Sequence, residues 1–181
     1  MSNPEHGIQI QLKKMDHKKK QMMEIIRSLP EEIYRLQPDQ YKWSVAQVAN
    51  HLYLSEMLSL AYLKKKLSYP EMVPPFSFKS WWALFFVSFT LWTPVKVKAP
   101  PKINMWGDQE VLSPDELDQR WNQVRNDMTA IIMDNLPRFR NHLVYNHPYA
   151  GRMTMRQMLV FMNHHIAHHL RQARRIISNI G

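Results

Sequence analysis

Histidine is the residue type whose number and spacing in this chain point most directly to chemistry. The chain holds nine histidines, and four of them fall within residues 163–172, which read NHHIAHHLRQ. His164 and His168 are four residues apart, as are His165 and His169. On a helix, this spacing places two side chains on one face with their Cβ atoms about 5–6 Å apart. Two imidazole nitrogens can then converge on one ion, which favours a nitrogen-ligated metal site.

The hydrophobic pattern of the same segment favours His165 and His169 as the pair that faces the protein interior. They continue a row that a helix here must bury, together with Met158, Met162, Gln172 and Ile176. His168 shares its row with Arg171 and Arg175, whose charges favour water, and His164 lies at the edge. Two buried imidazoles without polar partners are unfavourable, so we expect either a metal ion or a hydrogen-bond network around them.

A third histidine, His51, is a candidate for the same site. It lies in the middle of a predicted helix, between Val48 and Leu52, at the edge of the apolar stripe, and could point into the protein. A single histidine in such a place is more commonly a core group that is hydrogen bonded to a carbonyl or a hydroxyl. Spacing alone leaves both interpretations of His51 open.

Composition limits what kind of protein can position these residues. The chain has 181 residues, enough for one domain, which we expect to span 1–181. It has no cysteine, which excludes disulfides, cysteine-ligated zinc, iron–sulfur clusters and a protein thiol nucleophile, and fits the reducing cytoplasm. We see no export signal at the start of the chain. Four glycines against twelve prolines disfavour an extended β architecture and favour long helices that end at prolines.

Four segments have the spacing of amphipathic helices, and each has one apolar stripe. They cover residues 8–29, 44–68, 113–137 and 154–180, and a short helical turn follows Pro30. Each of the last three segments begins with a capping-box pattern: Ser44 with Gln47, Ser113 with Glu116, and Thr154 with Gln157. In the second, Val45, Val48, Leu52 and Leu58 form the stripe. In the third, Leu117, Trp121, Val124, Met128 and Ile131 form the stripe, and Pro137 is predicted to end it. Four such helices can bury their stripes only against one another, so we expect an all-α four-helix bundle.

The long connection over residues 70–107 is the irregular part of the chain. Within it, residues 81–92 read WWALFFVSFTLW, which is too short for a membrane span of about 20 residues. We expect a lid on the bundle or an interface with a partner chain, and hence a homodimer or a self-covered lid. The net charge of +9 favours anionic partners in general. The aromatic residues here do not alternate with basic ones, which disfavours a base-stacking surface, so we expect no nucleic acid partner.

Three stretches taken together resemble the DinB-like superfamily of bacterial four-helix metalloproteins. They are WSVAQVANHL at residues 43–52, HPYAGRMTMRQ at 147–157 and HIAHHLRQARRI at 165–176. The resemblance spans nearly the whole chain in the same order and is weakest over residues 70–107. It implies a metal triad of His51, His165 and His169, which includes the pair that periodicity favours.

Three neutral histidines and one open position are typical of a catalytic rather than a structural metal site. We expect a divalent cation, with Zn²⁺ or Ni²⁺ favoured and Fe²⁺ or Mn²⁺ also compatible with imidazole ligands. Gln47, Asn163 and Gln172 are candidates to hold the free ring nitrogens of the ligands. The chain has no His-Glu-x-x-His motif, so Glu56 and Asp127 are the helix-borne candidates for a general base.

The resemblance implies a metal-dependent enzyme with a small-molecule substrate. Characterised proteins similar to this architecture include transferases that use low-molecular-weight thiols such as bacillithiol or mycothiol, and a thiol-dependent isomerase. We therefore expect a metal that activates a small thiol, with activation of water in a hydrolase as the near alternative. A non-catalytic, stress-related interaction protein whose metal is structural is the second class. Members of the family are often dimers.

Overall fold

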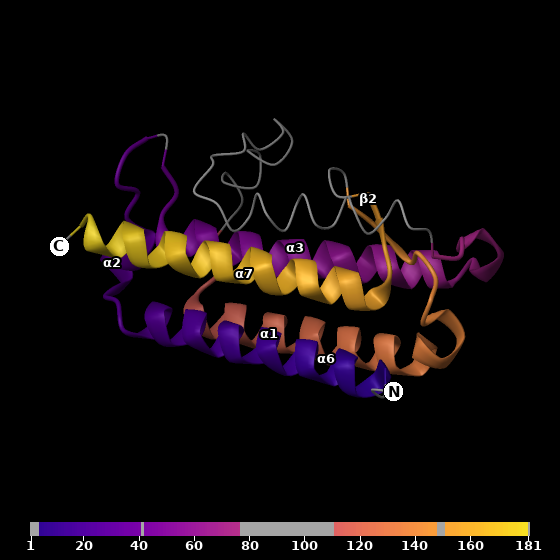
Figure 1. Ribbon diagram of the computed structural model, residues 1–181. Coiled ribbons are helices and arrows are strands. Elements are labelled where there is room, and N and C mark those ends of the chain that lie inside the picture. Colours follow the sequence, from indigo (N-terminus) through magenta and orange to yellow (C-terminus); the bar gives the residue numbers. More distant parts are fainter. Residues whose placement is uncertain (1–3, 41, 77–110, 148–150, 181) are drawn as a thin grey trace.

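The computed structural model describes residues 4–40, 42–76, 111–147 and 151–180. Most of this part is helical (Figure 1). The long helices are α1 (Pro4–Arg27), α3 (Val45–Leu67), α6 (Pro114–Phe139) and α7 (Met155–Ser178). The shorter elements are α2 (Glu31–Arg35), the 3₁₀ helix η1 (Pro70–Met72) and two strands, β1 (Tyr145–His147) and β2 (Gly151–Met153). The predicted all-α fold is confirmed.

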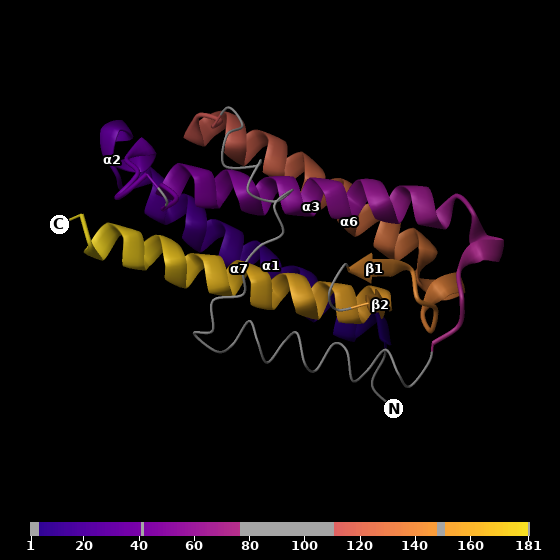
Figure 2. The same ribbon diagram turned by 90° about the horizontal axis from the view of Figure 1, so that it is seen from above.

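The four long helices lie side by side as a bundle. Helix α1 packs against α6 and α7, and α3 packs against the same two helices, so that each long helix has two neighbours around one core. In Figure 1, α3 and α7 form one layer and α1 and α6 the other, and Figure 2 shows α3 alongside α7 from above. Helices α3 and α6 begin at the same end of the bundle (Figure 1). A long connection between them is therefore required.

The buried stripes follow the helical period that the sequence predicts, with two local errors. The core of α1 holds Ile8, Leu12, Met15, Met22 and Ile26. In α3 the predicted core residue Leu58 is 45% exposed, and Leu60 and Leu63 are buried in its place. In α6 the stripe passes through Ile132, while Ile131 is only partly buried. At about 100° per residue, Leu58 lies off the stripe that Leu52, Leu60 and Leu63 share, whereas Ile131 and Ile132 lie on either side of the α6 stripe.

Side-chain caps set the starts of α3 and α7 as predicted. Ser44 and Gln47 form a complete capping box, and so do Thr154 and Gln157. At the start of α6 only one half of the capping box is formed, in which Ser113 Oγ accepts a hydrogen bond from the backbone N–H of Glu116. The Glu116 carboxylate accepts from Arg120 instead. The two complete boxes fix the starts of the two helices that carry the histidines.

The predicted boundaries of two helices, α1 and α6, are wrong. Helix α1 begins at Pro4, four residues before the predicted start at residue 8. It ends at Arg27, two residues before the predicted end at residue 29. Helix α6 does not end at Pro137 but continues to Phe139. Pro137 lies in the last turn, where few backbone hydrogen bonds follow it, and Phe139, which is buried in the core, holds this turn in place.

A short β-hairpin precedes α7 and was not predicted. Strands β1 and β2 are antiparallel, with Tyr145 opposite Met153 and His147 opposite Gly151. Gly151 has a φ of 70°, a conformation that favours glycine. Before the hairpin, the N–H of Leu143 donates to the carbonyl of Pro74 at 2.8 Å, which attaches residues following η1 to the end of α6. The hairpin thus leads the chain directly into the helix with the paired histidines.

The predicted lid or interface segment, residues 70–107, lies outside the described residues from position 77 onward, and so do all of residues 81–92. In the described parts of the chain, no helix is both long enough and apolar enough to pass through a membrane.

Candidate metal centre

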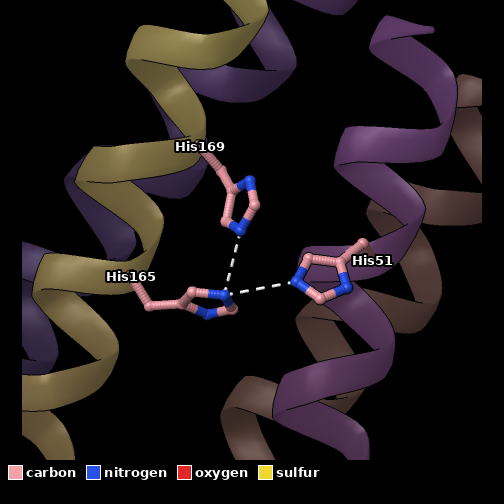
Figure 3. A group of neighbouring side chains, drawn as sticks. All are labelled: His51, His165 and His169. Carbon is pink, nitrogen blue, oxygen red and sulfur yellow. Dashed lines mark hydrogen bonds between the residues drawn. The ribbon is translucent and has the colours of Figure 1, made fainter. Parts of the chain in front are cut away.

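His51, His165 and His169 meet at the contact between α3 and α7. His51 projects from the second turn of α3, and the other two project from successive turns of α7 toward it (Figure 3). These are the three residues that the resemblance implies. Among the described residues, they form the one group of His, Cys, Asp or Glu side chains that could hold a metal ion, with all three ligand atoms within 4.8 Å of one another.

Nε2 of His165 is spaced from the Nε2 atoms of the other two histidines as ligands of one ion would be. Nε2 of His165 lies 3.2 Å from Nε2 of His51 and 3.0 Å from Nε2 of His169. Two nitrogens bonded at 2.0–2.1 Å to a tetrahedral zinc ion are about 3.3 Å apart, as its bond angle requires. The cluster therefore needs only a small outward adjustment to surround a cation.

Hydrogen bonding cannot satisfy this arrangement by itself. A neutral imidazole nitrogen carries either one proton or one lone pair, so it makes one ring hydrogen bond as donor or as acceptor. Nε2 of His165 faces two other Nε2 atoms at hydrogen-bond distance, and it can pair with only one of them. One cation that accepts three lone pairs satisfies all three atoms. The donor set therefore fits a metal ion better than a network of imidazoles alone.

Gln172 fixes the proton of one ring. Nδ1 of His169 lies 2.7 Å from Oε1 of Gln172, and since that oxygen only accepts, Nδ1 donates. The lone pair of His169 is therefore on Nε2 and points into the cluster. The other two residues predicted for this role act elsewhere: Gln47 in the cap of α3, and Asn163 in hydrogen bonds to Lys18 and Gln11. In the described part of the chain, neither is hydrogen bonded to the three rings.

Aromatic rings flank the cluster on two sides. The Trp43 ring lies 5.1 Å from the ring of His51 and 6.5 Å from that of His169, with its plane tilted by 15° from the latter. Phe161 stacks on His165, with ring centroids 5.9 Å apart and planes at 11°. Neither residue was predicted to contact the cluster. A signal existed for each, because Phe161 is four residues before His165 and Trp43 directly precedes the cap of α3.

Burial keeps the three histidines uncharged. His51 is 7% exposed and His169 is 9% exposed. Burial lowers the pKa of His51 to about 4. Burial, followed by the neighbouring histidines, holds the pKa values of His165 and His169 well below the usual 6.5. At neutral pH the rings are therefore in the deprotonated form that metal binding requires.

The remaining candidates lie outside this cluster. The Glu56 carboxylate is buried, but Arg125 of α6 donates to both of its oxygens. Asp127 accepts from Lys64 and Gln123 at the surface. His164 is exposed, and the ring of His168 meets the edge of His169 without joining the group. Periodicity therefore selected the inward pair of α7 correctly, and neither predicted base lies among the grouped ligands.

His147 is a fourth histidine close to the centre. It ends β1, and its ring lies 4.4 Å from that of Phe161, the residue that stacks on His165. Burial lowers the pKa of His147 to about 4, so that it too is neutral. The hairpin that the sequence did not predict is what brings it here.

Comparison with known proteins gives one match. The family model described as the DinB superfamily matches residues 15–173, a range that contains His51, His165 and His169. No curated protein and no solved structure matches the chain.

Proposed function

This chain belongs to the DinB superfamily, and from its histidine cluster we propose that it is a metal-dependent enzyme acting on a small molecule. In this proposal, His51, His165 and His169 hold a divalent cation that activates a small thiol or a water molecule. The observation that carries the proposal is the convergence of three neutral Nε2 atoms from two helices on one point.

Three imidazole ligands suit Zn²⁺ and Ni²⁺, and Fe²⁺ or Mn²⁺ are compatible. When bound, such an ion lowers the pKa of a coordinated thiol or water and makes it a nucleophile at neutral pH. Three protein ligands leave at least one position for the substrate, which is the pattern of catalytic sites.

In this proposal, the chain's own residues bind the cation and orient the histidines that hold it. Gln172 holds the tautomer of His169, and Trp43 and Phe161 cover the flanks of the cluster with apolar surface. Because the chain has no cysteine, a thiol nucleophile has to arrive as a separate small molecule. In the transferase form, the thiol loses its proton to solvent, its sulfur bonds to an electrophilic carbon, and the bond from that carbon to the leaving group breaks, so that the leaving group departs with the electron pair.

The test has two stages. Elemental analysis of the purified protein is expected to give one divalent cation per chain, and His165→Ala is expected to lose it. The metal-loaded protein is then assayed with a panel of low-molecular-weight thiols and electrophiles, and with small ester and amide substrates. Turnover that requires both the metal and His165 supports an enzyme. Stoichiometric metal without any turnover favours the non-catalytic class, in which the ion only stabilises the bundle.

We also propose that the chain forms a homodimer. Support comes from the apolar residues 81–92 and from large hydrophobic side chains exposed at the end of α3 and just beyond it, which are Leu58, Tyr62, Tyr69, Met72 and Phe76. Large exposed apolar patches commonly mark protein–protein contacts. Light scattering is expected to give twice the chain mass, and a monomer would favour a lid that covers this surface within one chain.

A further inference from the structure

Trp43 contacts metal-ligand candidates from both helices of the cluster. It directly precedes Ser44, the N-cap of α3, and its indole meets the ring of His51 on α3 and the ring of His169 on α7. In the described part of the chain, no other aromatic side chain outside the cluster makes ring contacts with histidines of both helices.

Histidine rings need such neighbours if they are to aim at one point. The torsion that turns an imidazole about its Cβ–Cγ bond is broad and weakly restricted. The direction of each Nε2 lone pair therefore depends on what surrounds the ring. His165 has the face of Phe161, and His169 has the hydrogen bond to Gln172. Trp43 adds a nearly parallel face for His169 and a tilted one, at 54°, for His51.

The backbone that carries Trp43 is itself firmly held. Ser44 is buried, and its side chain and backbone N–H both bond to Gln47 in the capping box. The indole is half-buried and packs against the hydrophobic core. Trp43 is thus a rigid element at the site, because its position is fixed by the start of the same helix that carries His51.

We propose that Trp43 is a positioning residue of the metal centre, which holds the rings of His51 and His169 at the mutual angle that metal binding requires. The inference rests on the proposed metal site. Loss of a residue that orients a metal-ligating histidine typically weakens metal affinity by about 10–100-fold. We expect Trp43→Ala to lie near the lower end of this range, because Gln172 still holds one of the two rings.

The experiment uses Co²⁺ as a spectroscopic probe with the full-length protein. Co²⁺ is titrated into the wild type and into Trp43→Ala, Trp43→Leu, Trp43→Phe and Trp121→Phe, while circular dichroism checks that each variant is folded. Trp121 is a matched control, since it is fully buried but contacts Lys19 and Arg125 rather than the cluster. Both the dissociation constant and the visible absorption bands of the bound Co²⁺ are recorded.

If Trp43 positions the two rings, Trp43→Ala and Trp43→Leu bind Co²⁺ roughly tenfold more weakly than the wild type, and the visible absorption bands of the bound ion change. In Trp43→Phe, which keeps an aromatic face, the dissociation constant and the bands are expected to lie closer to those of the wild type. In Trp121→Phe neither is expected to change. Folded Trp43 variants with wild-type affinity and wild-type bands would overturn the proposal while leaving the metal site intact. A wild type that binds no Co²⁺ would remove the metal site itself, and the role of Trp43 with it. If Trp43→Ala does not fold, the Trp43→Leu and Trp43→Phe variants decide whether Trp43 positions the two rings.

Discussion

Nδ1 of His169 donates a hydrogen bond to Oε1 of Gln172, at 2.7 Å, within the same turn of α7. This contact decides which nitrogen of His169 keeps its lone pair, and so it aims Nε2 at His51 and His165. Outer contacts of this kind fix both the tautomer and the orientation of a metal ligand.

Gln172→Ala is predicted to weaken metal binding by about 10–100-fold, because the proton of His169 is then free to move to Nε2. Gln172→Glu keeps an acceptor at the same place and is expected to retain most of the affinity. Competition with a chromophoric zinc chelator measures both constants. Equal affinities for the wild type and the alanine variant would show that the hydrogen bond does not orient the ring.

Trp43 is predicted to report metal binding through its fluorescence. An open-shell ion such as Ni²⁺ quenches a tryptophan only at short range, and the Trp43 ring lies 5.1 Å from the ring of His51. Titration with Ni²⁺ is expected to lower the emission of the wild type, although the chain has six tryptophans. In Trp43→Phe most of this decrease should disappear. A decrease of the same size in that variant would place the bound ion away from Trp43.

The ion pair between Glu56 and Arg125 is predicted to stabilise the bundle without serving the metal. Both side chains are buried, and Arg125 also donates to Asp16 at 2.9 Å. Removing one partner of such a pair costs about 3–5 kcal/mol, whereas replacing both by apolar residues is often close to neutral. Urea unfolding should therefore show a large loss of stability in Glu56→Ala and a much smaller one in Glu56→Leu combined with Arg125→Met.

The metal content of the Glu56 and Arg125 variants serves as the control for this prediction. If Glu56 has no part in the site, the folded double variant will bind zinc as the wild type does. A loss of zinc from that variant would mean that the carboxylate contributes to the centre.

Asp118 is predicted to contribute free energy of unfolding that the protein loses at acid pH. Burial by itself raises the pKa of this carboxyl, but the hydrogen bond and charge of Lys19, together with Arg27, outweigh it, so the pKa lies below its ordinary value of 3.8. A group whose pKa falls on folding stabilises the protein fully above its unfolded pKa. That contribution is lost as the pH drops through the lower, folded value.

The difference in unfolding free energy between wild type and Asp118→Asn is therefore expected to be constant from pH 7 to about 5 and to shrink below about pH 4. Urea midpoints measured across this range check it. A difference that grows toward acid pH would have the wrong sign for this interaction.

The sequence predicted those features that depend on one helix at a time. Capping boxes at Ser44 and Thr154, the buried stripe of α1 and the inward side of the paired histidines all follow from local patterns. The features it missed depend on how two segments meet. Lys19 interrupts an apolar stripe in the sequence, yet it is buried because Asp118 of α6 lies opposite.

The surroundings of the metal centre were not predicted for the same reason, because they too depend on how two segments meet. Periodicity places His51 at the edge of a buried face, but the approach of Trp43 to His169 depends on how α3 lies against α7. Likewise, His147 reaches the vicinity of the cluster through a hairpin with strands of three residues each, too short for an alternating pattern to be recognised.

Anomalous X-ray diffraction from crystals grown with one equivalent of Zn²⁺ tests the metal site most directly. We expect a single strong peak at the zinc edge, about 2.0–2.1 Å from Nε2 of His51, His165 and His169, with a further position open to solvent or substrate. Three imidazoles in place without a peak between them, or a peak bound by other side chains, would contradict it.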